Sequence, residues 1–252
     1  MLTRAQAAPL KETQDQGPPE SGPPIRPVPE VLHPDWLLWQ LADSAFPTGG
    51  FVHSGGLEAA WQHGEVPNRA ALERFIWASL GQCGRASVPL MTSAHAHPDL
   101  LAELDSFCES FLLNHVANRA SRAQGRSLLV AAERIFNAPE SLAGGAAKLT
   151  APPCGHLAPV FGAITRRLGI ARDDAGRLFL FLHLRGLIAA AVRLGIIGPL
   201  EAQTLQNCFA GVAQEIWSRS QGLGLDDLAQ ISPLLDIWQG THDRLYSRLF
   251  QS

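Results

Sequence analysis

The run Cys154-Gly155-His156 places a thiol and an imidazole two residues apart. Thiolate sulfur and imidazole nitrogen are ligands that zinc and other borderline transition metals prefer, and a loop allows both to face one ion. The sequence shows no second pair of ligands close to this run. We therefore favour a structural role for the run at the entry to a helix, and keep Cys154 and His156 as the candidate ligands if a metal is bound.

Other residues with catalytic potential lack the neighbours that their chemistry needs. Ser54 has no glycine two positions before it, which a nucleophile elbow requires, and it suits a capping serine ahead of Leu57-Glu58. His95 and His97 face opposite ways on a helix, so we interpret them as part of a polar turn rather than as a chelating pair. The chain is therefore not expected to be an enzyme.

Nucleotide and nucleic-acid binding are also disfavoured. Only two of the 20 cationic residues are lysines, Lys11 and Lys148. Lys148 lies in Ala-Ala-Lys-Leu-Thr, without the preceding glycine and following hydroxyl of a phosphate-binding G-K-[ST] loop. A formal net charge of −3 gives no broad basic surface with which to neutralise phosphates, so no nucleic-acid partner is expected.

Two segments have the composition of defined surfaces. Four glycines and one proline lie between residues 46 and 58, next to Phe46 and Phe51, which predicts a loop of fixed shape. The chain finishes with Tyr-Ser-Arg-Leu-Phe at residues 246–250. Terminal residues usually fray, and arginine and aromatic side chains dominate interface energetics, so we expect this end to dock on another surface.

The elements that position these residues are predicted to be helical. Leucine outnumbers valine 36 to 10, and no stretch alternates as a strand does. The longest helical pattern has small residues, Ser121 and Gly125, one turn apart in its middle, which suggests a close approach by a neighbouring backbone. The predicted helices run from Asn68 to Gly81 or Gly84, and over 101–111, 112–136, 155–168, 174–194 (capped by Asp173-Asp174 and buried from Leu178 onward) and 199–216. The predicted fold class is all-α, a single globular helical bundle.

Residues 1–34 differ in composition from the rest of the chain. They hold eight of the 18 prolines and no aromatic residue, which leaves too little apolar surface to order them. We predict a disordered Pro-rich N-terminal arm over 1–34 and a helical domain over 35–252. The arm does not resemble a signal peptide, and the longest apolar run, 178–192, is broken by two polar residues and is too short to cross a membrane. With four widely separated cysteines, these features predict a cytoplasmic protein with reduced thiols.

Several segments resemble the urease accessory protein UreF family. Residues 37–51, Leu-Leu-Trp-Gln-Leu-Ala-Asp-Ser-Ala-Phe-Pro-Thr-Gly-Gly-Phe, are similar to the family's leucine-rich lead into a P-x-G-G-F turn. Further similar segments follow in the family's order: Ser54 with 56–58, Ala120-Ser121 with Gly125-Arg126, Gly155-His156 with 159–162, 189–194, 232–236, His242 and 246–250. Because the order is shared over residues 36–252, the chain is identified as a member of this family.

The resemblance implies an all-helical, homodimeric, non-enzymatic protein. Family members bind the accessory protein UreD, also called UreH, and then recruit and regulate the GTPase UreG, which delivers nickel to apo-urease. The resemblance implies no stably bound cofactor, since nickel passes through the complex and GTP is bound by UreG. Two alternatives stay open: a nickel-binding carrier that uses Cys154 and His156, and a UreF-like partner of a GTPase that acts outside urease maturation.

Two sets of partner-binding residues follow from the resemblance. The set expected to face UreG is Pro47, Gly49, Gly50, Ser54, Glu58 and Arg126. The set expected to face UreD is Tyr246, Arg248, Leu249 and Phe250, where Arg248 and Phe250 anchor an end with little core of its own. The sequence departs from many bacterial relatives at His53, where they have tyrosine, and at Asp243, where they have glutamate.

Overall fold

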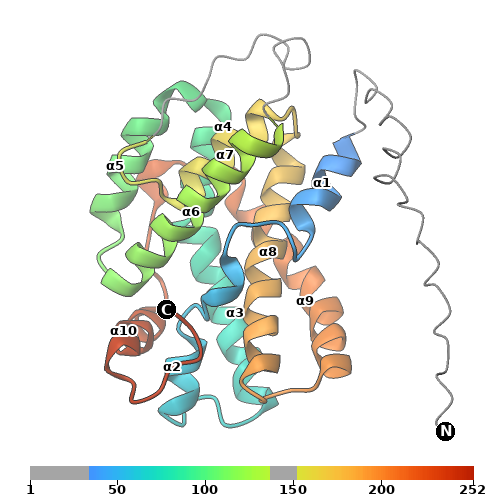
Figure 1. Cartoon of the computed structure of the whole chain (residues 1–252), viewed down its shortest axis with the longest axis vertical. Helices are drawn as coiled ribbons and strands as arrows, with labels where there is room; N and C mark the ends of the chain where they lie inside the picture. The colour runs from blue at the N-terminus through green and yellow to red at the C-terminus, as the bar shows by residue number, and fades with distance from the viewer. Residues whose placement is uncertain (1–33, 137–151) are drawn as a thin grey trace, which may run out of the picture. The chain divides into compact units, whose positions relative to one another are not determined.

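The computed structural model describes residues 34–136 and 152–252, and within these ranges all regular structure is helical (Figure 1). The α-helices are α1 (Pro34–Ala42), α2 (Leu57–Gln62), α3 (Arg69–Ala86), α4 (Val88–Ala96), α5 (Leu101–Phe111), α6 (His115–Phe136), α7 (Leu157–Arg167), α8 (Arg172–Arg193), α9 (Pro199–Ser220) and α10 (Pro233–Gly240). Short 3-10 helices are η1 (Gly50–Val52), η2 (Pro98–Leu100), η3 (Leu225–Asp227) and η4 (His242–Arg244). The predicted all-α bundle is confirmed. The predicted disordered arm, apart from Pro34, lies outside the described residues.

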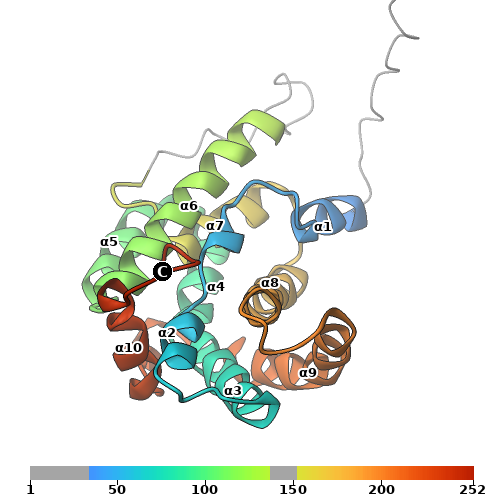
Figure 2. The same cartoon turned by 60° about the horizontal axis from the view of Figure 1, so that its bottom comes forward.

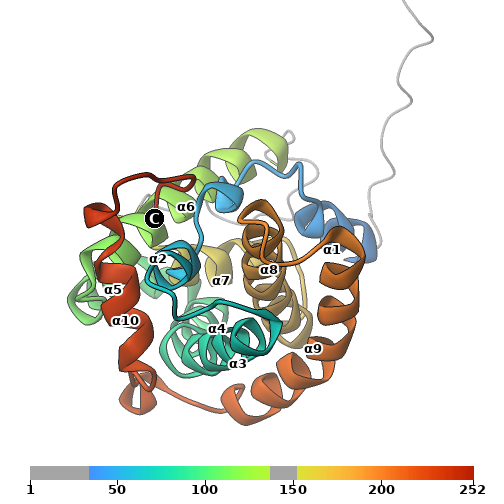
Figure 3. The same cartoon turned by 90° about the horizontal axis from the view of Figure 1, so that it is seen from below.

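Helix α8 is the central helix, packed against α9, α3, α4 and α7 (Figure 3). Apolar side chains surround it almost completely, and Leu180, Leu184 and Ala191 are buried. By length and composition alone, the 22 residues of α8 could cross a membrane, although the sequence predicts that the apolar run 178–192 within it is too short to do so. In this fold, 56% of the most apolar 18-residue window of α8 is buried. The neighbouring helices thus cover just over half of that window, and Phe181 remains 36% exposed, so the predicted burial of this helix is confirmed in part.

Helix α3 does not end at Gly81 or Gly84, where the sequence predicted its end, but continues to Ala86. A Cβ atom at Gly84 would lie 2.6 Å from Ile216 Cγ2 and 2.7 Å from Ser220 Oγ, both on α9. Gly84 is therefore a packing residue inside the helix, because its missing side chain allows α9 to approach.

Helix α4 has no counterpart in the predicted helices, because its residues are buried on nearly every side and show no amphipathic pattern. His95, predicted to lie in a polar turn, is on this helix, 3% exposed, with Nε2 2.9 Å from the Ile170 carbonyl. Burial lowers the pKa of His95 below its usual value. The interpretation of His95 as a turn residue is wrong, because helix packing encloses the imidazole.

The predicted helix over 112–136 begins later, at His115. Asn114 caps it, since its Oδ1 accepts hydrogen bonds from the main-chain N–H groups of Val116 and Ala117 at 3.0 and 3.3 Å. Helix α8 also differs at its start, because Ala171 is its N-cap and Asp173-Asp174 lie within the first turn. Carboxylates in the first turn still stabilise the helix through its dipole.

Helices α4 and α7 approach most closely at Gly162. An added Cβ there would overlap the Met91 main-chain oxygen and lie 2.9 Å from the His95 main-chain nitrogen. We expect Gly162→Ala to lower the free energy of unfolding by about 1–3 kcal/mol or more, because packed backbones must separate. Gly186→Ala on α8 is the matched control: no atom lies within 4 Å of its added Cβ, so helix propensity should raise stability by up to about 1 kcal/mol. Urea unfolding of both variants tests this, and equal effects would contradict it.

Candidate functional site

The glycine-rich stretch at residues 46–56, here called the glycine loop, connects α1 to α2 (Figure 2). Gly49, Gly55 and Gly56 have φ angles of 72°, 61° and 88°, which residues with a side chain rarely adopt. An added Cβ at Gly56 would also lie 3.0 Å from Gln239 Cβ on α10. The predicted loop of fixed shape is confirmed, because its backbone requires glycine at three positions.

The end of the chain, residues 245–252 and here called the tail, runs beside the glycine loop (Figure 2). The Gln251 N–H donates to the Val52 carbonyl at 2.8 Å, and the Ser54 N–H donates to the Ser252 main-chain oxygen at 2.6 Å. The Ser54 hydroxyl donates to the same oxygen at 3.1 Å. Ser252 is only 1% exposed, so the tail is held in place up to its last residue.

Glu58, in the first turn of α2, is 1% exposed and binds the main chain of the tail through its carboxylate. Its Oε1 accepts the Leu249 N–H at 2.6 Å, and its Oε2 accepts the Phe250 N–H at 3.1 Å. The second oxygen also lies 3.0 Å from His242 Nε2. A buried carboxylate is costly unless hydrogen-bond donors replace its lost water, and these three groups provide them.

His242 is fully buried between Glu58 and the core. Its Nε2 faces the Glu58 carboxylate, so we assign to Nε2 a proton that it donates to that carboxylate. Among the described residues, His242 Nδ1 is the one buried side-chain nitrogen or oxygen without a hydrogen bond, and Asp243 Oδ1 is 3.9 Å away. His242 therefore acts as a positioning residue for Glu58.

Asp243 connects the tail to α6. Arg119 on α6 donates to both of its carboxylate oxygens, at 2.9 and 2.8 Å, while His115 and Arg248 lie 3.3 and 3.4 Å from it. The hydrogen bonds from Arg119 lower the pKa of Asp243 to about 2. Asp243 thus forms a bidentate pair with Arg119 that fixes η4 against α6.

Phe250 packs inside this chain and not on its surface, with 5% of the residue exposed. The guanidinium carbon of Arg193, in the last turn of α8, lies 4.3 Å from the centre of its ring, and Arg193 also donates to the Phe51 carbonyl. The expectation that the tail has little core of its own is wrong, because Phe250 belongs to the main hydrophobic core.

The structure divides the predicted partner-binding residues into a buried and an exposed group. Ser54, Glu58 and Phe250 are buried where the tail meets the glycine loop, so they are not on the exposed surface of this structure and their partner contacts stay a prediction. Partly or fully exposed are Pro47, Gly49, Gly50, Arg126, Tyr246, Arg248 and Leu249. Partner binding by the exposed group stays a prediction.

A second buried carboxylate fixes the candidate metal ligands. Asp105 on α5 is 0% exposed and accepts the main-chain N–H groups of Cys154, Gly155 and His156 at 2.6, 3.0 and 2.6 Å. These groups precede the first turn of α7, where a negative charge is favourable. The predicted structural role of this run at a helix entry is thus confirmed, and Asp105 was missed although it follows the buried face of Leu101 and Leu104.

The side chain of His156 completes this cluster. The residue is 0% exposed, its Nε2 lies 2.8 Å from Glu109 Oε2, and its Nδ1 lies 3.1 Å from Ser121 Oγ. An added Cβ at Gly125 on α6 would overlap the Gly155 carbonyl oxygen. The predicted close approach of a neighbouring backbone to this helix is thus confirmed. One ligand atom from each of Glu109, Cys154 and His156 lies within 4.8 Å of the other two. Sequence reasoning missed Glu109, since only packing of α5 against α7 brings it there.

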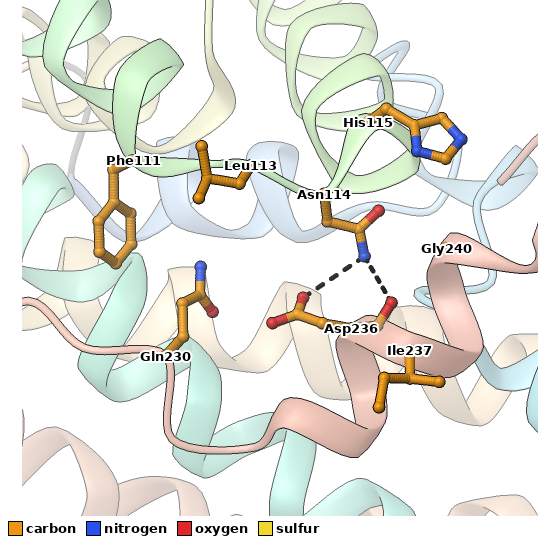
Figure 4. Close-up of a pocket in the computed structure, with 8 residues that line it drawn as sticks. All are labelled: Phe111, Leu113, Asn114, His115, Gln230, Asp236, Ile237 and Gly240. Atoms are coloured by element: carbon orange, nitrogen blue, oxygen red, sulfur yellow. Dashed lines mark hydrogen bonds between the residues drawn. The ribbon is translucent and has the colours of Figure 1, made fainter.

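A shallow hollow lies between the α5–α6 link and α10 (Figure 4). Asn114 Nδ2 donates to the main-chain oxygen of Asp236 at 2.9 Å and lies 3.4 Å from its carboxylate. Partial burial raises the pKa of Asp236. Leu113 and Ile237 at the hollow are 88% and 60% exposed, so apolar surface is open to solvent beside α10.

Replacing one carboxylate oxygen of Glu58 by an amide NH2, as in Glu58→Gln, should weaken the attachment of the tail. In Glu58→Gln, an amide NH2 would face a main-chain N–H, leaving a buried donor unpaired at a cost of about 1–3 kcal/mol. Hydrogen exchange at the Leu249 and Phe250 amides should therefore become about 5- to 150-fold faster. Glu65→Gln, at an exposed glutamate close in sequence, is the control. Unchanged exchange in Glu58→Gln would show that the carboxylate does not hold the tail.

Acid should weaken the fold as its buried histidines take up protons. Burial, followed by the charges of Arg119 and His242, lowers the pKa of His53 to about 4, and burial does the same for His183. The unfolded chain takes up these protons near pH 6.5, so stability is full above pH 6.5 and falls towards pH 4. Urea unfolding between pH 7.5 and 4 is expected to show this, with a smaller fall for His53→Gln than for the exposed-site control His97→Gln. A flat profile would contradict it.

Comparison with known proteins assigns this architecture to a family. The family model for UreF matches residues 66–210. A urease accessory protein F from Oryza sativa subsp. indica is 38% identical over 222 residues, covering 86% of this chain and 85% of the relative. One from Arabidopsis thaliana is 37% identical over 221 residues, covering 86% and 92%. A urease accessory protein UreF from Arthrobacter sp. is 31% identical over 215 residues, covering 85% and 96%. The chain therefore belongs to the UreF family of urease accessory proteins.

Proposed function

We propose that this chain acts in urease maturation as a non-catalytic scaffold that binds UreD, also called UreH, and then recruits and regulates the GTPase UreG. Membership of the UreF family supports an accessory role in urease maturation. In this proposal the chain is a cytoplasmic homodimer, GTP is bound by UreG, and nickel is the cargo delivered to apo-urease. The sequence has no phosphate-binding G-K-[ST] loop, so the scaffold depends on a partner for GTP hydrolysis.

The observation that carries the proposal is that the tail has one side buried in this chain and one side exposed to solvent. Glu58, Ser54 and the buried Phe250 hold its inner side, while Tyr246 is fully exposed and Leu249 is 52% exposed. A segment already ordered before binding loses less conformational entropy when a partner docks. The exposed apolar side chains Leu113 and Ile237 at the nearby hollow extend the same type of surface. We assign UreD to this side.

The exposed part of the glycine loop, Pro47 with Gly49 and Gly50, is the surface we assign to UreG. Its backbone is fixed by the φ angle at Gly49 and by packing on α6, where Gln124 Oε1 lies 3.3 Å from the Cβ position of Gly50. Glu58 contributes to this surface indirectly, through the loop and the tail. Its replacement by alanine is therefore expected to weaken both partner contacts, and not UreG recruitment alone.

A matched pair of leucines tests UreD binding without disturbing the core. Leu249 on the tail is 52% exposed, and Leu200 on α9 is 87% exposed. Leu249→Ala, alone and with Tyr246→Ala, is expected to lower co-purification with UreD at least about fivefold, because an interface anchor of this size contributes about 1 kcal/mol or more. Leu200→Ala should bind as the unchanged chain does. Circular dichroism should be the same for all variants.

UreG provides the second half of the test. A pull-down with UreD and UreG, with and without GTP, should recover UreG only when UreD binding is intact. Full UreD binding by the Leu249→Ala, Tyr246→Ala double variant would overturn the tail assignment. Capture of a different GTPase in the absence of UreD and UreG binding would instead support the alternative of a UreF-like partner outside urease maturation.

A further inference from the structure

A mixed set of sulfur, nitrogen and oxygen donors meets where α5 faces the start of α7. Glu109 comes from α5, while Cys154 and His156 come from the segment that leads into α7. One ligand atom of each lies within 4.8 Å of the other two. We infer that these three side chains form a binding site for one divalent transition-metal cation of borderline softness, with Cys154 Sγ, His156 Nε2 and a Glu109 carboxylate oxygen as ligands. The inference does not depend on the proposed partner contacts.

The burial of the three ligands gives the site one closed and one open side. His156 is 0% exposed, whereas Glu109 and Cys154 are both partly exposed. Zinc and similar ions bound by three protein ligands keep a fourth position for water or an incoming ligand. The open side faces a groove that Glu109, Asn118 and Arg122 line, so an ion held here stays within reach of solvent.

The backbone that carries two of the ligands is fixed before any ion binds. The Asp105 carboxylate accepts the N–H groups of both Cys154 and His156, each at 2.6 Å. Arg126 Nε donates to the Cys154 carbonyl at 2.8 Å from the other side. Preorganised ligands bind metal more tightly, because little conformational freedom remains to be lost on binding.

Ser121 provides the outer hydrogen bond that a metal-binding imidazole needs. Its Oγ lies 3.1 Å from His156 Nδ1 and accepts the Leu157 N–H at 3.2 Å. A hydroxyl oxygen accepts as well as donates, so it can take the Nδ1 proton and leave the Nε2 lone pair free for the ion. Such outer partners fix the tautomer and orientation of ligating histidines.

Without an ion, a hydrogen bond connects two of the ligands. His156 Nε2 is 2.8 Å from Glu109 Oε2, and Cys154 Sγ lies within 4.8 Å of the same two residues' ligand atoms. Around a tetrahedral ion with bonds of about 2.0–2.3 Å, donor atoms lie about 3.3–3.7 Å apart, so the carboxylate must move by about half an ångström. Glu109 is partly exposed and its contact with Arg122 is long, at 3.7 Å. The movement must therefore stretch or replace one further hydrogen bond, the one that Asn118 Nδ2 donates to Glu109 Oε2 at 3.0 Å. When the ion binds, the Cys154 thiol releases its proton to solvent, and the imidazole of His156 carries its single proton on Nδ1, towards Ser121, so that Nε2 binds the ion.

Metal titration of the full chain tests the site. Calorimetry with Ni2+ and with Zn2+ should show one equivalent bound, and Co2+ should give a thiolate-to-cobalt absorption band in the near ultraviolet. Cys154→Ser and Glu109→Gln should weaken binding at least about tenfold, and Ser121→Ala about 10- to 100-fold. The matched controls are Cys208→Ser and Glu103→Gln, which change an exposed cysteine and an exposed glutamate of α5.

The outcomes separate this site from the proposed function. Binding that is lost in Cys154→Ser and Glu109→Gln but kept in both controls supports the site, as does a cobalt-thiolate band that disappears only with Cys154. Absence of binding by the unchanged chain, or equal binding by the Cys154→Ser and Cys208→Ser variants, overturns it. The metal-ligand variants are expected to retain UreD and UreG binding. Absence of metal binding would therefore leave the scaffold proposal intact, and absence of UreD and UreG binding would leave the metal site intact.

Discussion

The buried carboxylate of Glu58 is the interaction on which the arrangement of the glycine loop and the tail depends. A carboxylate with 1% exposure must find hydrogen-bond donors inside the protein, and here two of the three belong to the tail. The tail cannot leave without exposing Phe250 and removing two of the three hydrogen-bond donors to the carboxylate. The glycine loop, α2, η4 and the tail are therefore held as one unit, and the exposed residues on that unit are presented in a fixed geometry.

Asp105 serves the same physical purpose elsewhere in the fold. It satisfies three consecutive main-chain N–H groups at the entry to α7 and thereby fixes α5 against that helix. In each case main-chain N–H groups of a segment outside the α-helices are satisfied by charge-assisted hydrogen bonds to a buried acid. This explains how loops rich in glycine and proline keep a defined shape in a bundle whose helices are held by apolar packing.

The helices with a clear amphipathic or wholly apolar pattern were predicted well. The central position of α8, the face of α5 and the start of α9 at Pro199 follow from local sequence, because their periodicity reflects burial directly. The errors lie where packing overrides a local signal. Gly84 is a helix breaker by propensity but a contact point for α9 in the fold, and α4 is too evenly buried to show a period.

The sequence by itself determined the helical class, the family and the glycine loop, because composition, periodicity and the demand for positive φ angles are local properties. Only the tertiary structure decided which polar residues are buried together. Glu58 is 184 positions from His242, and Glu109 is 47 positions from His156, so no local pattern connects them. The same packing moved Glu58 and Phe250 from the expected surface into the interior, since a buried acid and an aromatic ring are stable only where donors and apolar neighbours meet.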